Sequence, residues 1–177
     1  KMINKIYKRI HNQYSVLFKF IFFLRHLFGI FFISIVLFLT IPHFFDFEKK
    51  DRIIKNYLLK NYDLKLNKYE SIKYNSLPRP NLEIFHASNS LNLTEVNLDT
   101  TSLKIYPKLI NIYNLENLKA NKIILNNNDI SLKLPELKIL SQYIYKLKNK
   151  ITLNNSDFKI LNENELLINF NKVSFSN

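Results

Sequence analysis

Histidine and the acidic residues are the side chains of this 177-residue chain that could carry acid–base or metal chemistry. The four histidines are His11, His26, His43 and His86. None has another histidine three or four residues away, the spacing that brings two metal ligands to one helix face. The 14 acidic residues are scattered, and no spacing marks two of them as a catalytic pair. A lone histidine such as His86 is typical of a partly exposed structural position.

Cysteine and glycine usage excludes several further kinds of site. The chain has no cysteine, which removes disulfides, thiolate nucleophiles and zinc–thiolate centres. Its one glycine, Gly29, lies inside the longest apolar run, so glycine-rich phosphate loops, dinucleotide fingerprints and the G-x-S-x-G motif of serine hydrolases are absent. We therefore predict that the chain is not an enzyme and uses no metal or cofactor.

The net charge of +12 is divided unevenly along the chain. Six of the 26 basic residues precede residue 26 with no acid among them, and the other 20 mingle with all 14 acids after residue 45. A nucleic-acid-binding domain gathers its Lys and Arg into a dense stripe, often with aromatic side chains between them. No such stripe occurs here, so the charge argues against a nucleic-acid partner.

An apolar run of 19 residues, Leu27–Phe45, contains no ionisable side chain before His43. A helix of this length spans about 28 Å, close to the roughly 30 Å hydrocarbon thickness of a bilayer. We therefore predict that residues 27–45 form a transmembrane helix and that the lipid bilayer is one partner of the chain.

A shorter apolar run, Val16–Leu24, precedes the span and is interrupted by Lys19 and closed by Arg25. This run is too short to cross the membrane a second time. We expect residues 1–26 to be a cytoplasmic basic tail and the start of the membrane helix. Lys19 and Arg25 would then lie at the membrane interface, where their long side chains reach lipid phosphates.

The charges that flank the span predict its orientation. Residues 46–52 hold three acids and three bases, whereas residues 1–25 hold bases alone, so the positive-inside rule places the N-terminus in the cytoplasm. A cleaved signal peptide needs small residues after its apolar core, and the first alanine of the chain is Ala87. We predict an uncleaved, single-pass anchor in a bacterial inner membrane, with residues 46–177 as a periplasmic domain.

Beyond residue 63 the apolar residues recur with a period of two, which predicts strands that have one apolar and one polar face. The alternating positions are Leu64 and Leu66, Leu82 and Ile84, Leu91 and Leu93, Val96 and Leu98, Leu103 and Ile105, Ile123 and Leu125, Ile130, Leu132 and Leu134, Ile151 and Leu153, Phe158 and Ile160, Leu166, Ile168 and Phe170, and Val173 and Phe175. Asn-rich segments at 126–129, 154–155 and 162–164 are expected to be turns, because Asn tolerates positive φ.

Two segments show the helical period instead. Residues 49–59 place Ile53, Ile54, Tyr57 and Leu58 on one face of a short amphipathic helix. Residues 135–148 carry apolar residues at spacings of three and four, with Pro135 at the position that favours a helix start. The predicted fold is α+β and mainly β: a transmembrane helix, a short amphipathic helix, and a curved antiparallel sheet with one further peripheral helix.

The order of these elements resembles the N-terminal region of AsmA-like proteins. The segment after the span reads DRIIKNYLLKNYDLKLNKYESIKYNSLPRPNLEIFHASNSL, and Leu77-Pro78-Arg79-Pro80 before the strand at residues 81–84 is its most recognisable part. The strands at 103–106 and 118–125 continue the resemblance, which covers roughly residues 27–134. The glycine usual in the family after the first helix is replaced by residues 61–63. A lysine before Met2 and a final strand pattern are expected of a piece of a longer protein.

The resemblance implies an anchored, periplasmic β structure involved in phospholipid transport toward the outer membrane and in outer-membrane homeostasis. An apolar sheet face suits that role, because it shields acyl chains from water. Two other hypotheses stay open: a subunit of the lipopolysaccharide bridge, and a membrane-tethered scaffold or assembly factor that binds other envelope proteins through sheet edges.

Six aliphatic residues from neighbouring strands are the candidates for a lipid-facing groove, because no charged residue interrupts them. They are Leu103, Ile105, Ile123, Leu125, Ile130 and Leu132. An open, curved sheet would expose these side chains in an apolar groove, whereas a closed sheet would bury them in its own core. The sequence leaves both arrangements open.

Overall fold

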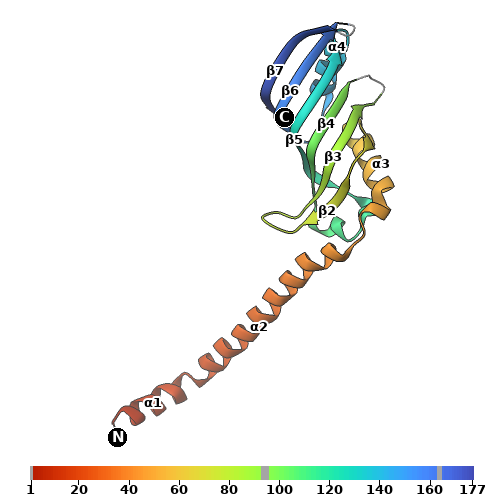
Figure 1. Cartoon of the computed structure of the whole chain (residues 1–177). Helices are drawn as coiled ribbons and strands as arrows, with labels where there is room; N and C mark the ends of the chain where they lie inside the picture. The colour runs from red at the N-terminus through yellow and green to blue at the C-terminus, as the bar shows by residue number, and fades with distance from the viewer. Residues whose placement is uncertain (1, 93–95, 163–164) are drawn as a thin grey trace. The chain divides into compact units, whose positions relative to one another are not determined.

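The computed structural model describes residues 2–92, 96–162 and 165–177, and it divides into two compact units, one up to Ile41 and the other from Pro42 onward (Figure 1). The first unit holds α1 (Met2–Gln13) and α2 (Ser15–Thr40). Lys1, Leu93 and residues 163–164 of the expected turn lie outside the described residues.

The predicted span lies in the longest helix of the chain. Helix α2 continues into a 3-10 turn, η1 (Ile41–Phe44), so that 30 residues from Ser15 to Phe44 form one helix that is long and apolar enough to cross a membrane. None of its α-helical residues is buried. Its polar groups are satisfied locally, because the hydroxyls of Ser34 and Thr40 each donate to the carbonyl four residues earlier.

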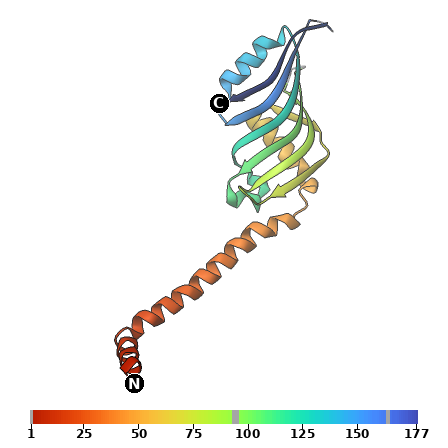
Figure 2. The same ribbon diagram turned by 60° about the vertical axis from the view of Figure 1, so that its left-hand side comes forward.

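The second unit is a seven-stranded sheet with helices along it (Figures 1 and 2). Its elements are η2 (Glu48–Lys50), α3 (Asp51–Tyr62), β1 (Leu64–Lys68), β2 (Ser71–Asn75), β3 (Asn81–Leu91), β4 (Asn97–Pro107), η3 (Leu109–Ile112), η4 (Leu115–Asn117), β5 (Ala120–Lys133), α4 (Glu136–Lys146), β6 (Ile151–Asn162) and β7 (Glu165–Ser176). The strand order is β1-β3-β4-β5-β6-β7, with β2 also paired to β3, and the sheet does not close.

The predicted fold class is confirmed, with two differences in the sheet. Strands β5 and β6 are parallel, because α4 and its flanking loops return the chain to the end at which β5 begins. The sheet is therefore mixed, although every other pairing is antiparallel. Strand β2 was not among the predicted strands, since only Ile72 and Tyr74 alternate over its five residues.

The core lies between α3 and one face of the sheet, which we call the inner face. Ile54, Leu58 and Tyr62 follow one another at spacings of four along α3, and all three are buried. They belong to the same hydrophobic cluster as the inner-face residues of β3, β4 and β5. Asp63 follows the last residue of α3, and its left-handed backbone (φ 48°) turns the chain into β1.

A line of backbone irregularities crosses the sheet. His86, Asn127, Asn155 and Lys172, on β3, β5, β6 and β7, all have positive φ, between 46° and 56°. The residues that flank Asn127 pair with those that flank Asn155, and the Asn155 Nδ2 donates to the Asn127 Oδ1 at 2.6 Å. The expected turns at 126–129 and 154–155 are therefore bulges within long strands, where Asn supplies the predicted positive φ.

Candidate functional site

The six candidate groove residues are buried in this structure. Each of them is 2% exposed or less, and all belong to the cluster that contains Ile54 and Leu58 of α3. The prediction that these six line an open groove is corrected, because side chains of α3, α4 and the 3-10 turns η3 and η4 pack into or against the same cluster and exclude solvent from it. On β4 and β5 the apolar residues therefore form the core of the domain itself, which is the closed arrangement.

An apolar face is exposed farther along the sheet, on β7. The register with β6 pairs Ile160 with Ile168 and Phe158 with Phe170, which puts alternate apolar residues of β7 on the inner face and leaves exposed Leu167 on the opposite face. The exposed fractions are 57% for Leu166, 46% for Ile168, 50% for Phe170 and 37% for Val173, and Phe175 is partly buried. The apolar inner face thus continues from β6 onto β7. Strand β7 has the same alternating pattern, but α3 does not cover it.

Helix α4 covers only part of this second half of the inner face. It contacts β5, and its Leu140 and Tyr143 pack against the core cluster. Leu137 and Ile139 on the same helix remain exposed. Strand β7 has no described helix over it, so an apolar strip along β7 meets solvent.

The outer edge of β7 is also uncovered. Among the described strands, β7 pairs with β6 alone and ends the strand order of the sheet. A terminal strand presents a row of backbone N–H and C=O groups on its free side. Strand β7 therefore offers two distinct surfaces, an apolar inner face and a polar backbone edge.

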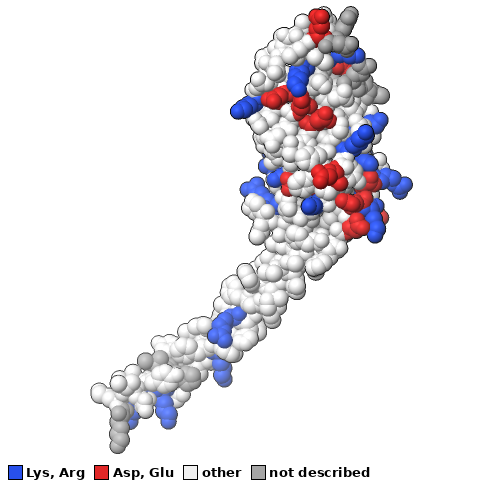
Figure 3. Space-filling view, viewed as in Figure 1, with Lys and Arg blue, Asp and Glu red and all other residues white. Residues whose placement is uncertain are grey.

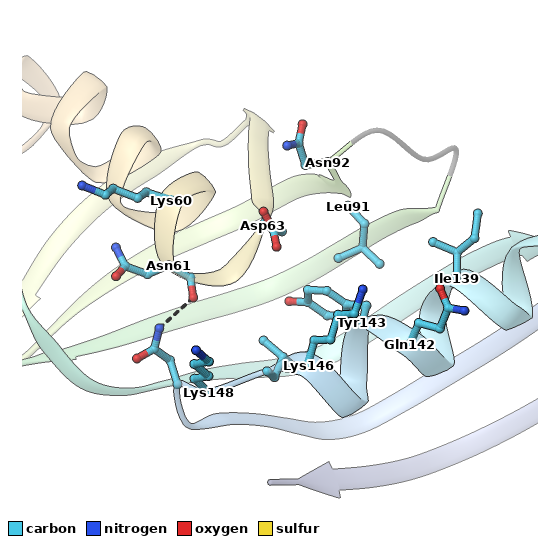
Figure 4. A pocket seen from close by; sticks show the side chains of 12 residues that line it. Lys60, Asn61, Asp63, Leu91, Asn92, Ile139, Gln142, Tyr143, Lys146 and Lys148 are labelled. Carbon is cyan, nitrogen blue, oxygen red and sulfur yellow. Dashed lines mark hydrogen bonds between the residues drawn. The ribbon is translucent and has the colours of Figure 1, made fainter.

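A pocket of about 420 Å³ lies on the other side of α4, between the C-terminal ends of α3 and α4 (Figure 4). Lys60, Lys146, Lys148 and Asp63 line it, and the Asn149 Nδ2 donates to the carbonyl of Asn61 across it at 2.8 Å. The carbonyl ends of two helices favour cations, which accounts for Lys60 and Lys146 in the last turns of α3 and α4. These lysines are explained by their stabilising effect on the helix ends, so they do not by themselves indicate an anion-binding site.

One hydrogen bond fixes the two helices to each other beside this pocket. The Tyr143 hydroxyl donates to the backbone carbonyl of Tyr62, the last residue of α3. Burial raises the pKa of both phenols above the ordinary value of 10.0, so both keep their protons to a higher pH than an exposed tyrosine does.

The residues that could do acid–base chemistry do not converge. His86 Nε2 lies 3.6 Å from a carboxylate oxygen of Glu70 on the surface, and His43 Nε2 lies 3.3 Å from Ser76 Oγ. Within the described part of the chain, no three His, Asp or Glu side chains are placed to hold a metal ion. Acidic and basic residues mix over the visible face of the second unit, whereas the first unit shows only basic ones (Figure 3).

The two predicted interface residues lie on α2. Lys19 and Arg25 are both exposed, and the Arg25 guanidinium lies 5.2 Å from the ring centre of Phe22. Their contact with lipid stays a prediction.

Comparisons with known proteins leave the family open. No protein-family model, no curated protein and no solved structure matches this chain.

Proposed function

We propose that this chain is a single-pass protein of a bacterial inner membrane whose β-rich unit, in the periplasm, holds phospholipid acyl chains on the inner face of β7. Its role would be phospholipid transport toward the outer membrane and outer-membrane homeostasis, as the AsmA-like resemblance implies. The observation that carries the proposal is the apolar strip of Leu166, Ile168, Phe170, Val173 and Phe175, which continues the core of the domain into solvent.

The chemistry of the strip favours an acyl chain as its occupant. These five side chains offer no hydrogen-bond donor or acceptor, so a ligand gains from them only by keeping its own apolar surface dry. Each 100 Å² of surface removed from water contributes roughly 2.5 kcal/mol. The same chain carries a helix that is long and apolar enough to cross a membrane, and this helix would tether the domain to a phospholipid bilayer.

The membrane-tethered scaffold is the second candidate, and the free edge of β7 is the observation that favours it. An extended segment of another envelope protein would add to this edge through backbone hydrogen bonds. Such a partner would be held in a fixed ratio to the chain and would need no lipid. The same free edge would let a lipopolysaccharide-bridge subunit pair with a strand of another protein.

Phospholipid exchange between vesicles tests the proposal. The full chain is reconstituted in donor vesicles, and the removal of a fluorescent phospholipid to acceptor vesicles is followed. We expect a several-fold slower transfer for Phe170→Asp, because a carboxylate on the strip repels acyl chains. The matched control is Asn169→Asp, which places the same charge on the opposite face of the same strand. Equal transfer by the wild type, both variants and empty vesicles would overturn the proposal.

A further inference from the structure

Exposed apolar side chains also gather at one end of the second unit, away from the strip on β7. Leu77 lies in the β2–β3 loop and is 74% exposed, and Ile110 lies in η3 and is 80% exposed. Leu109 beside it is half exposed. Large apolar side chains at loop tips, with solvent around them, indicate a surface that meets an apolar partner.

The sheet register puts these two loops at the same end. Asn81 at the start of β3 pairs with Asn75 at the end of β2, and Leu82 next to it pairs with Ile105 near the end of β4. Ile105 in turn pairs with Ile123 near the start of β5. The loop at 76–80 and the segment at 108–119 therefore project beyond the same end of the sheet (Figure 1).

The chain leaves the membrane-spanning helix at this same end. His43 contacts the edge of the Tyr74 ring, with 4.9 Å between ring centres, and its Nε2 is 3.3 Å from Ser76 Oγ, next to Leu77. Phe45 meets Tyr113, just after η3, edge to face at 5.6 Å. His43 and Phe45 are therefore packed against these two parts of the second unit, and Phe47 is buried in it.

These contacts limit how far the loops can lie from the bilayer. The apolar helix ends at Phe44, which is 83% exposed, and the residues on either side of Phe44 are those that hold the loops. A few residues of chain reach only about 3.5 Å each. The loop tips must therefore lie within the depth of the headgroup region or close to it.

The charges at this end also suit a phospholipid surface. Arg79 and Lys108 are exposed beside Leu77 and Leu109, and neither side chain has an ion-pair partner among the described residues. Of the nearby acids, Asp46 is paired with Lys49 at 3.0 Å, and exposed Glu116 in the segment at 108–119 is offset by exposed Lys119. Apolar tips flanked by free cations are the combination that inserts into the interface of an anionic bilayer.

We propose that this end of the domain, with Phe44, Leu77, Leu109 and Ile110 as its apolar tips, docks into the phospholipid bilayer beside the anchor. Leu77 and Ile110 enter the acyl region, and Arg79 and Lys108 bind lipid phosphates. The proposal does not depend on a lipid-carrying role for β7, because it uses other residues and a different lipid arrangement.

Depth-dependent quenching on the full chain tests this docking. The chain has no cysteine, so Leu77→Cys, Ile110→Cys and Leu134→Cys each give one labelling site for an environment-sensitive fluorophore. Leu134 is the matched control, since it is an exposed apolar residue just beyond the opposite end of β5. The variants are reconstituted in vesicles of phosphatidylcholine and phosphatidylglycerol, with or without brominated acyl chains.

We expect brominated lipids to quench the labels at positions 77 and 110 several-fold more than the label at 134. Adding Leu77→Asp to the Ile110→Cys chain should reduce that quenching, whereas Leu77→Phe should preserve it. Both substitutions are at an exposed position, so the fold is retained. Labels at 77 and 110 that respond to aqueous iodide as strongly as the label at 134, and not to brominated lipid, would overturn the proposal.

Discussion

Phe158 and Phe170 lie opposite each other on β6 and β7 and share the inner face, yet Phe158 packs against the core while Phe170 is half exposed. The boundary between the closed core and the proposed lipid surface therefore runs between two neighbouring phenylalanines. Both lie in strands with alternating apolar residues, but β6 has a strand on each side whereas β7 ends the strand order.

The same charge should have different consequences on the two sides of this boundary. Ile123→Asp places a carboxylate at a position with no exposure, without a partner, and should destabilise the fold by at least about 3 kcal/mol. Phe170→Asp should cost about 1 kcal/mol, as is usual at a half-exposed site. Circular dichroism during chemical denaturation measures both. A folded, equally stable Ile123→Asp variant would restore the open groove at the six buried residues.

Alkaline pH should weaken the contact between α3 and α4. Burial raises the pKa of Tyr62 and Tyr143, so the unfolded chain releases these phenolic protons before the folded one does. Their contribution to stability is therefore fully present below about pH 10 and is lost as the pH rises beyond it. Denaturation at a series of pH values should show a shallower decline for Tyr143→Phe than for the wild type.

Tyr145→Phe is the control for this pH series, because Tyr145 is 92% exposed on the same helix. At neutral pH, Tyr143→Phe should cost about 1 kcal/mol through the lost hydrogen bond to the Tyr62 carbonyl, and Tyr145→Phe should cost nothing measurable. Parallel pH profiles for all three proteins would show that the buried Tyr143 phenol does not govern the alkaline decline.

The bulge on β5 should tolerate glycine better than alanine. Asn127 has a φ of 51°, a conformation that costs residues with a Cβ roughly 1 kcal/mol unless they are Asn or Asp. Asn127→Gly loses only the exposed hydrogen bond from Asn155, whereas Asn127→Ala also acquires backbone strain. Thermal denaturation should rank the variants in that order. An alanine variant as stable as the glycine variant would indicate that the bulge relaxes.

Topology reporters test the predicted orientation. A reporter active only in the periplasm should be active when fused after Asn177, because the residues before the span carry bases alone. A cytoplasmic reporter at the same position should be silent. The opposite pattern would reverse the orientation and remove the basis for a periplasmic role.

The sequence predicted most of the elements, because each carries its own period. The run at 27–45, the amphipathic residues around Ile54 and the alternation of the strands all depend on local patterns, and α4 was expected from spacings of three and four. The parallel pairing of β5 with β6 was missed because it depends on where a crossover helix takes the chain. The turns expected at Asn127 and Asn155 are bulges in the structure, for a related reason. An Asn with positive φ is suited to a turn and to a bulge alike, and only the pairing of the flanking residues with a neighbouring strand distinguishes the two.

The location of the exposed apolar face could not be predicted from the pattern. Leu103 and Phe170 both belong to strands whose apolar residues alternate and whose inner face carries no charged side chain. The sequence pattern does not indicate which of these strands a helix covers. Burial of the six proposed residues follows from long-range packing, whereas the exposure of β7 follows from its place at the end of the strand order. The period of apolar residues in a single sequence does not indicate the order of the strands in the sheet.

Site-specific photo-crosslinking in membranes tests the central claim most directly. A photoreactive amino acid is placed at Phe170, at Asn169 on the opposite face of β7, or at buried Ile123, and the full chain is irradiated in phospholipid membranes. We expect phospholipid adducts, identified by mass spectrometry, at position 170 and few or none at 169 and 123. Adducts that are equally frequent at 169 and 170, or absent from 170, would contradict it.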